Sequence, residues 1–419
     1  MIVEHLSLVD FRNYAAVDLA LRPGPNVFVG KNGQGKTNLV EAIAFFATLG
    51  SHRVSSDAPM VRDGAEHAIV RARLAHGERR VQLEAQVNRR GSNKARVNGT
   101  PVRTAELPRY AQVVLFAPED LQIVRGDPSA RRRFADQLLV QRAPRMAGVL
   151  ADYDRVLKQR TALLKSARAR GLKAEALSTL DVWDDKLVTL GTEIIRARTA
   201  LAIDLTPPVA AAYRAIAGED HRPELEWALS FSRDADGDAE SDEDDEAAPR
   251  AAETDAAAAV MPTAADVVAQ FRAALAARRS AELDRGITLV GPHRDDLVLR
   301  VRGLPVKGYA SHGESWSVAL SLRLASAELL RADSQLGDPI VILDDVFAEL
   351  DSGRRGRLAE LTVGFEQVIV TAAVDADVPG ALRAHTLRVE AGAIVDPEDS
   401  SPVGAGRGHG EGIDGGAHG

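Results

Sequence analysis

Cysteine is absent from the 419-residue chain. Without thiols the chain has no disulfides, no thiolate zinc site and no cysteine nucleophile. This absence is compatible with a reducing compartment such as the cytoplasm. Aromatic residues are also sparse, at 4%, but hydrophobic residues reach 45%, which is enough for a buried core along most of the chain. The length favours two to three domains.

Long apolar runs are missing as well. No stretch of about 18 apolar residues occurs, so we expect no transmembrane helix and no membrane partner. The first residues, MIVEHLSLVDFRNY, carry Glu4 and Asp10 inside their apolar stretch, which is not typical of a secretory signal. We therefore expect a cytoplasmic protein.

The net charge of −8 disfavours a nucleic-acid partner until its distribution is considered. Residues 234–255 hold eleven acidic residues and one arginine, whereas residues 131–173 hold twelve basic residues and three acidic ones. A basic segment in an otherwise balanced chain is the electrostatic footprint expected for binding phosphate backbones.

The pattern of apolar residues predicts a mixed α/β region at each end of the chain. Strands are expected at 1–9, 14–21, 25–30, within 67–87 and at 111–118, with a hairpin at Asn98-Gly99. A helix is expected from Thr37 to Ala47. Strand 286–291 is expected to return the chain to this region, followed by a helix at 315–332 and a strand at 340–343.

The middle of the chain has a mainly helical pattern of apolar residues. Residues 129–217 are nearly all helical in pattern, and a further helix is expected at about 264–284. Residues 233–262 predict a disordered acidic insertion, either a solvated loop or a mimic of DNA that competes for the basic segment. We expect a head built from 1–128 and 285–392, a helical lobe at 129–284, and a disordered tail at 393–419.

The sequence GKNGQGKT matches the phosphate-binding pattern G-x-x-x-x-G-K-[ST] between a strand and a helix. Glycines let successive backbone N–H groups face phosphate oxygens, and the helix N-terminus adds its positive end. We expect Lys36 to contact the β and γ phosphates of ATP and Thr37 to bind Mg²⁺. The expected nucleotide ligands are Gly30, Lys31, Asn32, Gly33, Gln34, Gly35, Lys36, Thr37 and Asn38.

A second motif, PIVILDDVFAELD, begins at Pro339 and is rich in acidic residues. Four apolar residues form a buried strand that ends at Asp344, where a carboxylate can hold Mg²⁺ beside a bound nucleotide. Asp345 stands where ABC-type ATPase heads place the acid that orients or deprotonates the attacking water; Glu is usual there. The catalytic set expected is Lys36, Asp344 and Asp345. An acidic turn after a core strand is the plainer alternative.

The sequence SHGES, at 311–315, lies where ABC-type heads carry a signature motif. Its Ser and helix N-terminus would contact the γ-phosphate held by a second subunit, which predicts Ser311 and Gly313 as nucleotide ligands. Glu314 replaces the common Gln and would repel a triphosphate unless it points away. An ordinary helix N-cap is the alternative. Arg53, after the first helix, is a further candidate for a phosphate or interface contact.

Several ordered motifs resemble the RecF family of bacterial repair ATPases: PEDLQIVRGDPSARRRFAD (118–136), ITLVGPHRDDL (287–297), ILDDVFAELD and GSHR (50–53). The resemblance covers 1–232 and 263–392. It implies a P-loop ABC-type ATPase head with a mixed sheet and an inserted helical lobe. It also implies slow, DNA-stimulated ATP hydrolysis, an ATP-dependent homodimer on double-stranded and gapped or single-stranded DNA, and work with RecR and RecO to load RecA.

The DNA-binding residues are expected in the basic segment, with contacts to phosphates rather than to base edges. The candidates are Arg131, Arg132, Arg133, Lys158, Arg160, Lys165, Arg168, Arg170 and Lys173. Some of Arg131 to Arg133 are expected to brace the lobe against the head instead. The sheet near Lys94 and Arg96 is the alternative DNA surface. A solvated helical face would explain the same charges. Three other functions remain open: an ABC transporter subunit, another SMC-like chromosome-maintenance ATPase, and a non-hydrolysing DNA scaffold clamped by ATP.

Overall fold

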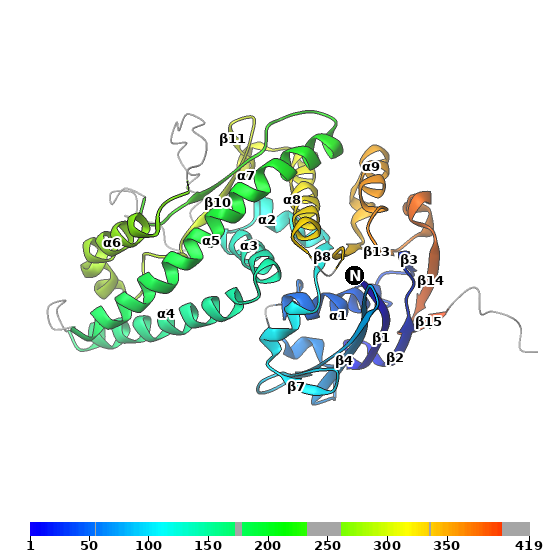
Figure 1. The fold of residues 1–419 in the computed structure, drawn as a ribbon, viewed down its shortest axis with the longest axis horizontal. Helices are drawn as coiled ribbons and strands as arrows, with labels where there is room; N and C mark the ends of the chain where they lie inside the picture. Colours follow the sequence, from blue (N-terminus) through cyan, green and yellow to red (C-terminus); the bar gives the residue numbers. More distant parts are fainter. Residues whose placement is uncertain (55, 172–177, 233–260, 335–336, 396–419) are drawn as a thin grey trace, which may run out of the picture.

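The computed structural model describes residues 1–54, 56–171, 178–232, 261–334 and 337–395 (Figure 1). Nearly all of the expected acidic insertion, most of the expected tail and Lys173 lie outside the described residues.

The central sheet joins the two ends of the chain. Its order is β15-β14-β3-β13-β12-β8, with β3, β8, β12, β13 and β14 parallel and β15 antiparallel. The strands are β3 (Gly24–Val29), β8 (Val113–Phe116), β12 (Ile340–Asp344), β13 (Gln367–Ala372), β14 (His385–Glu390) and β15 (Ala393–Val395). Every residue of β12 is buried, in agreement with its continuous apolar run. The mixed sheet expected from sequence is confirmed.

A second, antiparallel sheet has the order β2-β1-β4-β5-β6-β7. Its strands are β1 (Ile2–Phe11), β2 (Tyr14–Ala20), β4 (His67–His76), β5 (Arg79–Asn88), β6 (Lys94–Val97) and β7 (Thr100–Val102). Asn98 and Gly99 both have positive φ, which confirms the predicted hairpin. Helix α1 (Lys36–Thr48) lies between the two sheets, and side chains from all three elements form one core (Figure 1).

Helices cover the other face of the central sheet and extend away from it. They are α2 (Leu121–Arg125), α3 (Pro128–Arg142), α4 (Met146–Ala169), α5 (Ser178–Ala217), α6 (Ala264–Arg285), α7 (Val306–Tyr309), α8 (His312–Asp333) and α9 (Ser352–Thr362). A small sheet, ordered β11-β10-β9, accompanies them: β9 (Glu224–Ala228), β10 (Asp296–Val301) and β11 (Leu304–Pro305). Short 3-10 helices lie at Ala58–Met60, Thr104–Arg109, Pro118–Asp120, Val346–Glu349, Asp375–Asp377 and Gly380–Leu382.

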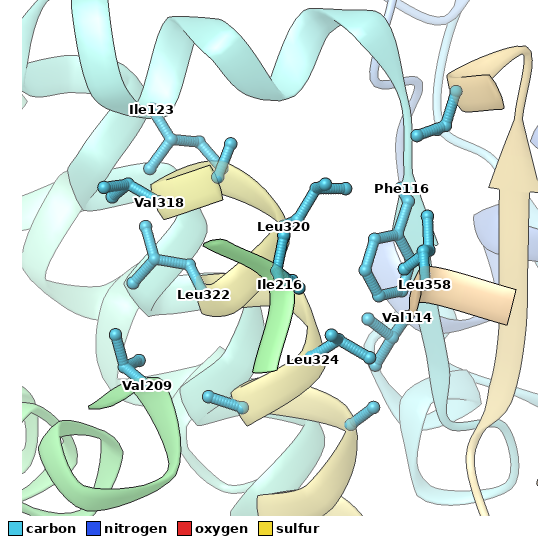
Figure 2. Packing of buried hydrophobic residues seen from close by; sticks show 14 of the residues in the cluster. Val114, Phe116, Ile123, Val209, Ile216, Val318, Leu320, Leu322, Leu324 and Leu358 are labelled. Carbon is cyan, nitrogen blue, oxygen red and sulfur yellow. The ribbon is translucent and has the colours of Figure 1, made fainter. Parts of the chain in front are cut away.

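Two hydrophobic cores organise this helical part. The first joins α3, α5, α8 and α9 to strands β8 and β12; Figure 2 shows Val114 and Phe116 of β8 facing Leu320 and Leu324 of α8. The second lies farther out, among α4, α5 and α6. Because α5 contributes to both cores, one helix connects the head to its lobe (Figure 1).

The strand expected at 286–291 does not form. Its buried backbone is held by side chains instead of a sheet: the N–H groups of Leu289 and Gly291 donate to Glu282 and Ser230. Gly286, in the left-handed conformation, ends α6, and the next strand begins only at Asp296. Residues 286–291 are apolar because they are buried, a property that a buried strand shares. Across the described chain, no helix combines the length and hydropathy that crossing a membrane requires.

Candidate nucleotide-binding site

The loop between β3 and α1 has the shape of a phosphate cradle. Gly35 precedes α1 with φ of 114°, a conformation that favours glycine. A methyl group on Gly35 would come within 2.8 Å of the Tyr14 hydroxyl, and one on Gly30 within 2.3 Å of the Val389 carbonyl oxygen. Close packing therefore requires glycine at both positions, and backbone conformation requires it at Gly35 as well.

Lys36 extends back over this loop. Its ammonium donates to the carbonyl oxygen of Gly30 at 2.8 Å and lies 3.4 Å from both the carbonyl oxygen of Lys31 and Oδ1 of Asn32. Lys36 is 3% exposed, and no carboxylate partner is recorded for it among the described residues. A buried cation held only by neutral oxygens is suited to receive phosphate oxygens from a ligand.

The two ATPase motifs meet at one carboxylate. The Thr37 hydroxyl donates to Oδ1 of Asp344 at 3.0 Å, although 307 residues separate them in sequence. The Thr371 hydroxyl donates to the same oxygen at 2.5 Å. Burial raises the pKa of Asp344 to about 7, and the neighbouring charge of Asp345 also raises it.

Thr371 was not predicted from the sequence. It is the penultimate residue of β13, and the parallel register of β12 and β13 places it opposite Asp344. A Thr near the end of a buried apolar strand, as in QVIVTA, is the signal that could have identified it.

These oxygens suit Mg²⁺. A magnesium ion prefers oxygen ligands and keeps several waters, so one carboxylate and one hydroxyl beside phosphate oxygens form an adequate protein contribution. The raised pKa of Asp344 supports this assignment, because a divalent cation would favour the ionised carboxylate that burial disfavours.

Asp345 follows directly at the end of the strand. Its φ of 50° is left-handed, and its backbone N–H donates to the Thr371 hydroxyl at 3.0 Å. Asp345 follows the last residue of β12 and is the N-cap of the 3-10 helix Val346–Glu349. Such a conformation is costly for a residue with a side chain, and it recurs at functional sites. Asp345 is partly buried, beside the proposed Mg²⁺ ligand.

His52 was missed by the sequence analysis. Its Nε2 lies 3.8 Å from Oδ2 of Asp344, and its side chain is 15% exposed. Both ring nitrogens are buried, with no hydrogen-bond partner among the residues that the structure describes. Burial lowers the pKa of His52, which favours a neutral imidazole beside the proposed metal ligand. The GSHR motif was the available signal.

Hydrogen bonds through two asparagine side chains connect Arg53 to the phosphate loop. Arg53 donates to Asn38 at 3.0 Å, Asn38 donates to Asn13 at 2.8 Å, and Asn13 donates to the carbonyl oxygen of Gln34 at 3.0 Å. Asn13, Asn38 and Arg53 border an open depression of about 550 Å³. Arg12 also lines it and pairs with Glu41 at 2.6 Å. Arg12 and Asn13, in the sequence FRNY, were not predicted.

The signature segment begins α8. The Ser311 hydroxyl accepts from the Glu314 N–H at 3.2 Å, and Oε2 of Glu314 accepts from the Ser311 N–H at 2.9 Å, a reciprocal capping box. Glu314 also forms an ion pair with Arg302. The Ser311 backbone N–H and Arg302 both lower the pKa of Glu314. The carboxylate expected to repel a triphosphate is thus held by its own helix cap and a cation.

Ser311 and Gly313 remain predicted trans ligands. Among the described residues, no hydrogen bond or ion pair joins residues 311–315 to the phosphate loop of the same chain.

Two of the predicted DNA-binding arginines have structural partners instead. Arg131 is 5% exposed and forms a two-pronged ion pair with Asp296, at 2.6 and 2.9 Å. Arg132 is partly buried and donates to the Asp295 carbonyl oxygen at 2.7 Å. Arg131 and Arg132 therefore fasten α3 to β10 and the residue before it, which is the bracing role expected for part of this group. Arg160, another candidate, is fully buried and pairs with Asp184 and Glu282, so it is corrected from a DNA ligand to a structural residue. Charge alone cannot distinguish these roles in sequence.

Other predicted positions do face solvent. Arg133, Lys165 and Arg168 are exposed, as are Lys94 and Arg96 on β6. Lys165 and Arg168 both lie against Gly286 at the end of α6, so their side chains are neighbours.

The fold and the meeting of Thr37 with Asp344 define a P-loop ATPase head with an inserted helical lobe. The model of the RecF/RecN/SMC N terminal domain matches residues 2–391. A DNA replication and repair protein RecF from Clavibacter sepedonicus is 60% identical over 417 residues, covering 100% of both chains. RecF from Leifsonia xyli subsp. xyli is 56% identical over 397 residues, 95% of this chain and 100% of its own.

A solved structure of the recombination mediator protein RecF with ATP, in the RecFOR pathway, aligns with a TM-score of 0.80 at 26% identity, covering 94% of this chain and 97% of that one. The chain therefore belongs to the RecF/RecN/SMC family, in which these full-length relatives are RecF proteins.

Proposed function

We propose that this chain is a cytoplasmic ATP-dependent DNA-binding ATPase of recombinational repair and replication. ATP and Mg²⁺ drive two copies together on double-stranded, gapped or single-stranded DNA, and slow hydrolysis releases them. The contact between Thr37 and Asp344 carries this proposal, because it brings the phosphate loop and the acidic strand to a single point.

Each residue has a distinct task in this function. Gly30 to Asn38 hold the phosphates, and the Lys36 ammonium leaves the Gly30 carbonyl for the β and γ phosphates. Thr37 and Asp344 hold Mg²⁺, which when bound neutralises charge between the phosphates. Asp345 orients the attacking water and accepts its proton. Ser311 and Gly313 contact the nucleotide of the second subunit, so a symmetric dimer encloses two ATP molecules.

The relatives support the cellular role. Full-length relatives are named DNA replication and repair proteins, and a solved relative is described as a recombination mediator of the RecFOR pathway. From this similarity we propose RecR and RecO as partners and loading of RecA on gapped DNA as the outcome.

A turnover assay tests the enzymatic part. Phosphate release is measured with Mg²⁺-ATP, with and without gapped DNA, while light scattering follows dimerisation. DNA-stimulated turnover and an ATP-dependent dimer are expected. For Asp345→Asn, ATP binding and dimerisation should persist while turnover falls. Wild-type turnover in Asp345→Asn would remove Asp345 from the catalytic role, and a wild-type dimer without any turnover would favour the non-hydrolysing clamp.

Two matched double variants locate the DNA surface. Lys165→Ala with Arg168→Ala removes two exposed charges from the lobe, and Lys94→Ala with Arg96→Ala removes two from the antiparallel sheet. Each lost phosphate contact should flatten the slope of log K against log salt by about 0.9. A slope flattened only in the lobe variant supports the lobe surface. A slope flattened only in the sheet variant moves the DNA to β6.

A further inference from the structure

The guanidinium of Arg354 lies against the first turn of the signature helix α8. It belongs to the first turn of α9, directly after the acidic strand and its loop. A methyl group built on Gly313 would lie 3.0 Å from Nη1 and 3.1 Å from Nη2 of Arg354. The glycine of the signature therefore makes room for this guanidinium, and the guanidinium lies beside the backbone that begins α8.

The partners of Arg354 leave part of its charge available. Nη1 donates to Oδ2 of Asp351 at 2.7 Å, and Asp351 also accepts from the Arg354 backbone N–H at 2.9 Å. The Asp351 side chain is 55% exposed, whereas that of Arg354 is 25% exposed. Nε of Arg354 is buried, and the described residues offer it no hydrogen-bond partner. The guanidinium is thus mostly covered, with one solvated carboxylate as its only ion-pair partner in the described chain.

Electrostatics makes this arrangement unusual for a helix start. The N-terminus of a helix carries a partial positive charge and favours anions. Glu314 is the acidic residue of that first turn, but it is occupied by the Ser311 N–H and by Arg302. Arg354 adds a second positive group at the same point. An anion placed between the two would receive backbone N–H groups and a guanidinium together.

We propose that Arg354 contacts the γ-phosphate of the ATP held by the second subunit, exchanging Asp351 for phosphate when the dimer forms. This inference rests on the proposed ATP-dependent dimer. Arg354 then acts in trans, stabilising negative charge on the transferred phosphoryl group, while Ser311 and Gly313 hold the same group from the helix end. No new covalent step is added: water attacks the γ-phosphorus, ADP leaves, and Asp345 accepts the proton.

Single variants give the first test. Arg354→Ala should bind ATP to the monomer as the wild type does, because the phosphate loop is intact, but its turnover in the presence of DNA should fall about 10³-fold. Arg354→Lys should recover part of this loss, since it keeps the charge without the planar fork. Arg355→Ala is the matched control: Arg355 is next on α9 but donates to Asp377 and to the Leu350 carbonyl oxygen, so its turnover should stay within about twofold of wild type.

Mixed dimers test the action in trans. Asp345→Asn and Arg354→Ala chains should each be inactive as homodimers, and Asp345→Asn is expected to keep ATP binding and dimerisation. A dimer of the two holds one site with both native residues if Arg354 acts across the interface, so an equal mixture should recover about a quarter of wild-type turnover. No recovery, or Arg354→Ala turnover within twofold of wild type, overturns the inference. If the Arg354→Ala chain fails to fold by circular dichroism, Arg354→Lys replaces it in the mixture.

Measurements on the wild-type chain distinguish a failure of this inference from a failure of the proposed function. A wild-type chain that stays monomeric with ATP, Mg²⁺ and gapped DNA overturns both the proposed dimer and the role of Arg354. A wild-type dimer with normal turnover and unaffected Arg354 variants overturns the role of Arg354 alone.

Discussion

The helical lobe and the nucleotide edge of the head both bury charged side chains, but they satisfy them differently. In the lobe, Arg160 is fully buried and donates hydrogen bonds to Asp184, Glu282 and Thr288. The two carboxylates neutralise its charge within the chain. At the nucleotide edge, Lys36 meets only neutral oxygens. A buried charge that is neutralised by opposite charges stabilises the fold, whereas a buried charge with only neutral partners is suited to bind a charged ligand.

The largest effect on stability is expected from the lobe. Arg160→Met leaves the buried carboxylate of Glu282 without a cation, whereas Asp184 keeps its ion pair with Arg279. The uncompensated carboxylate should cost about 3–5 kcal/mol of unfolding free energy. Denaturant titration measures the loss. Adding Glu282→Gln to Arg160→Met should restore part of it, because the uncompensated charge is then gone. Full wild-type stability in Arg160→Met would remove the contrast between the two regions.

At the nucleotide edge, the expected effect is on activity. Lys36→Arg should lower turnover about 10²–10³-fold, because the guanidinium does not fit a loop in which the ammonium lies 2.8 Å from the Gly30 carbonyl oxygen. ATP binding should weaken but persist, and DNA-stimulated dimerisation should be lost. Lys158→Arg, on the exposed face of α4, is the matched control and should keep wild-type turnover. Normal turnover in Lys36→Arg would show that the phosphate loop accommodates a guanidinium group.

Acid should unfold the lobe through His293. Burial lowers the pKa of His293 to about 4; its Nε2 donates to the Thr288 carbonyl oxygen, and its Nδ1 accepts from the Tyr153 hydroxyl. The unfolded chain binds a proton near pH 6.5 and the folded chain does not, so stability is complete above pH 6.5 and is lost as the pH falls from 6.5 to 4. The loss should approach about 3 kcal/mol.

His293→Gln provides the comparison for this pH dependence. The variant has no imidazole to protonate, so its stability should change less between pH 7 and pH 4 than that of the wild type. Chemical denaturation at a series of pH values measures the difference. Parallel curves for the two proteins would exclude His293 as the acid-sensitive group.

The contrast between the regions also explains what could be predicted from the sequence. The phosphate loop and the acidic strand depend on local backbone, with glycines at required positions and an apolar run ending in Asp344, and both are readable from adjacent residues. The structural role of Arg131 could not be assigned from the sequence, because its partner Asp296 is 165 residues away, on strand β10. Thr371 was not predicted, because its place beside Asp344 depends on the register of β12 and β13. Asp345 was predicted as a site residue, but its left-handed backbone was not.

The smallest effect is expected from Glu314→Gln. Sequence alone made Glu314 a source of repulsion for a triphosphate, but its carboxylate accepts from the Ser311 N–H and pairs with Arg302. Gln keeps the capping box, because its side-chain oxygen can accept the same N–H, and it loses only a partly exposed ion pair, worth about 0–1 kcal/mol. Turnover and ATP-dependent dimerisation should therefore stay within about threefold of wild type. Glu314→Ala, which loses the cap as well, should lower the thermal midpoint more than Glu314→Gln does. A large rise in dimer affinity for Glu314→Gln alone would instead mean that the carboxylate faces the second subunit's phosphates, and that the pairing with Arg302 does not neutralise it.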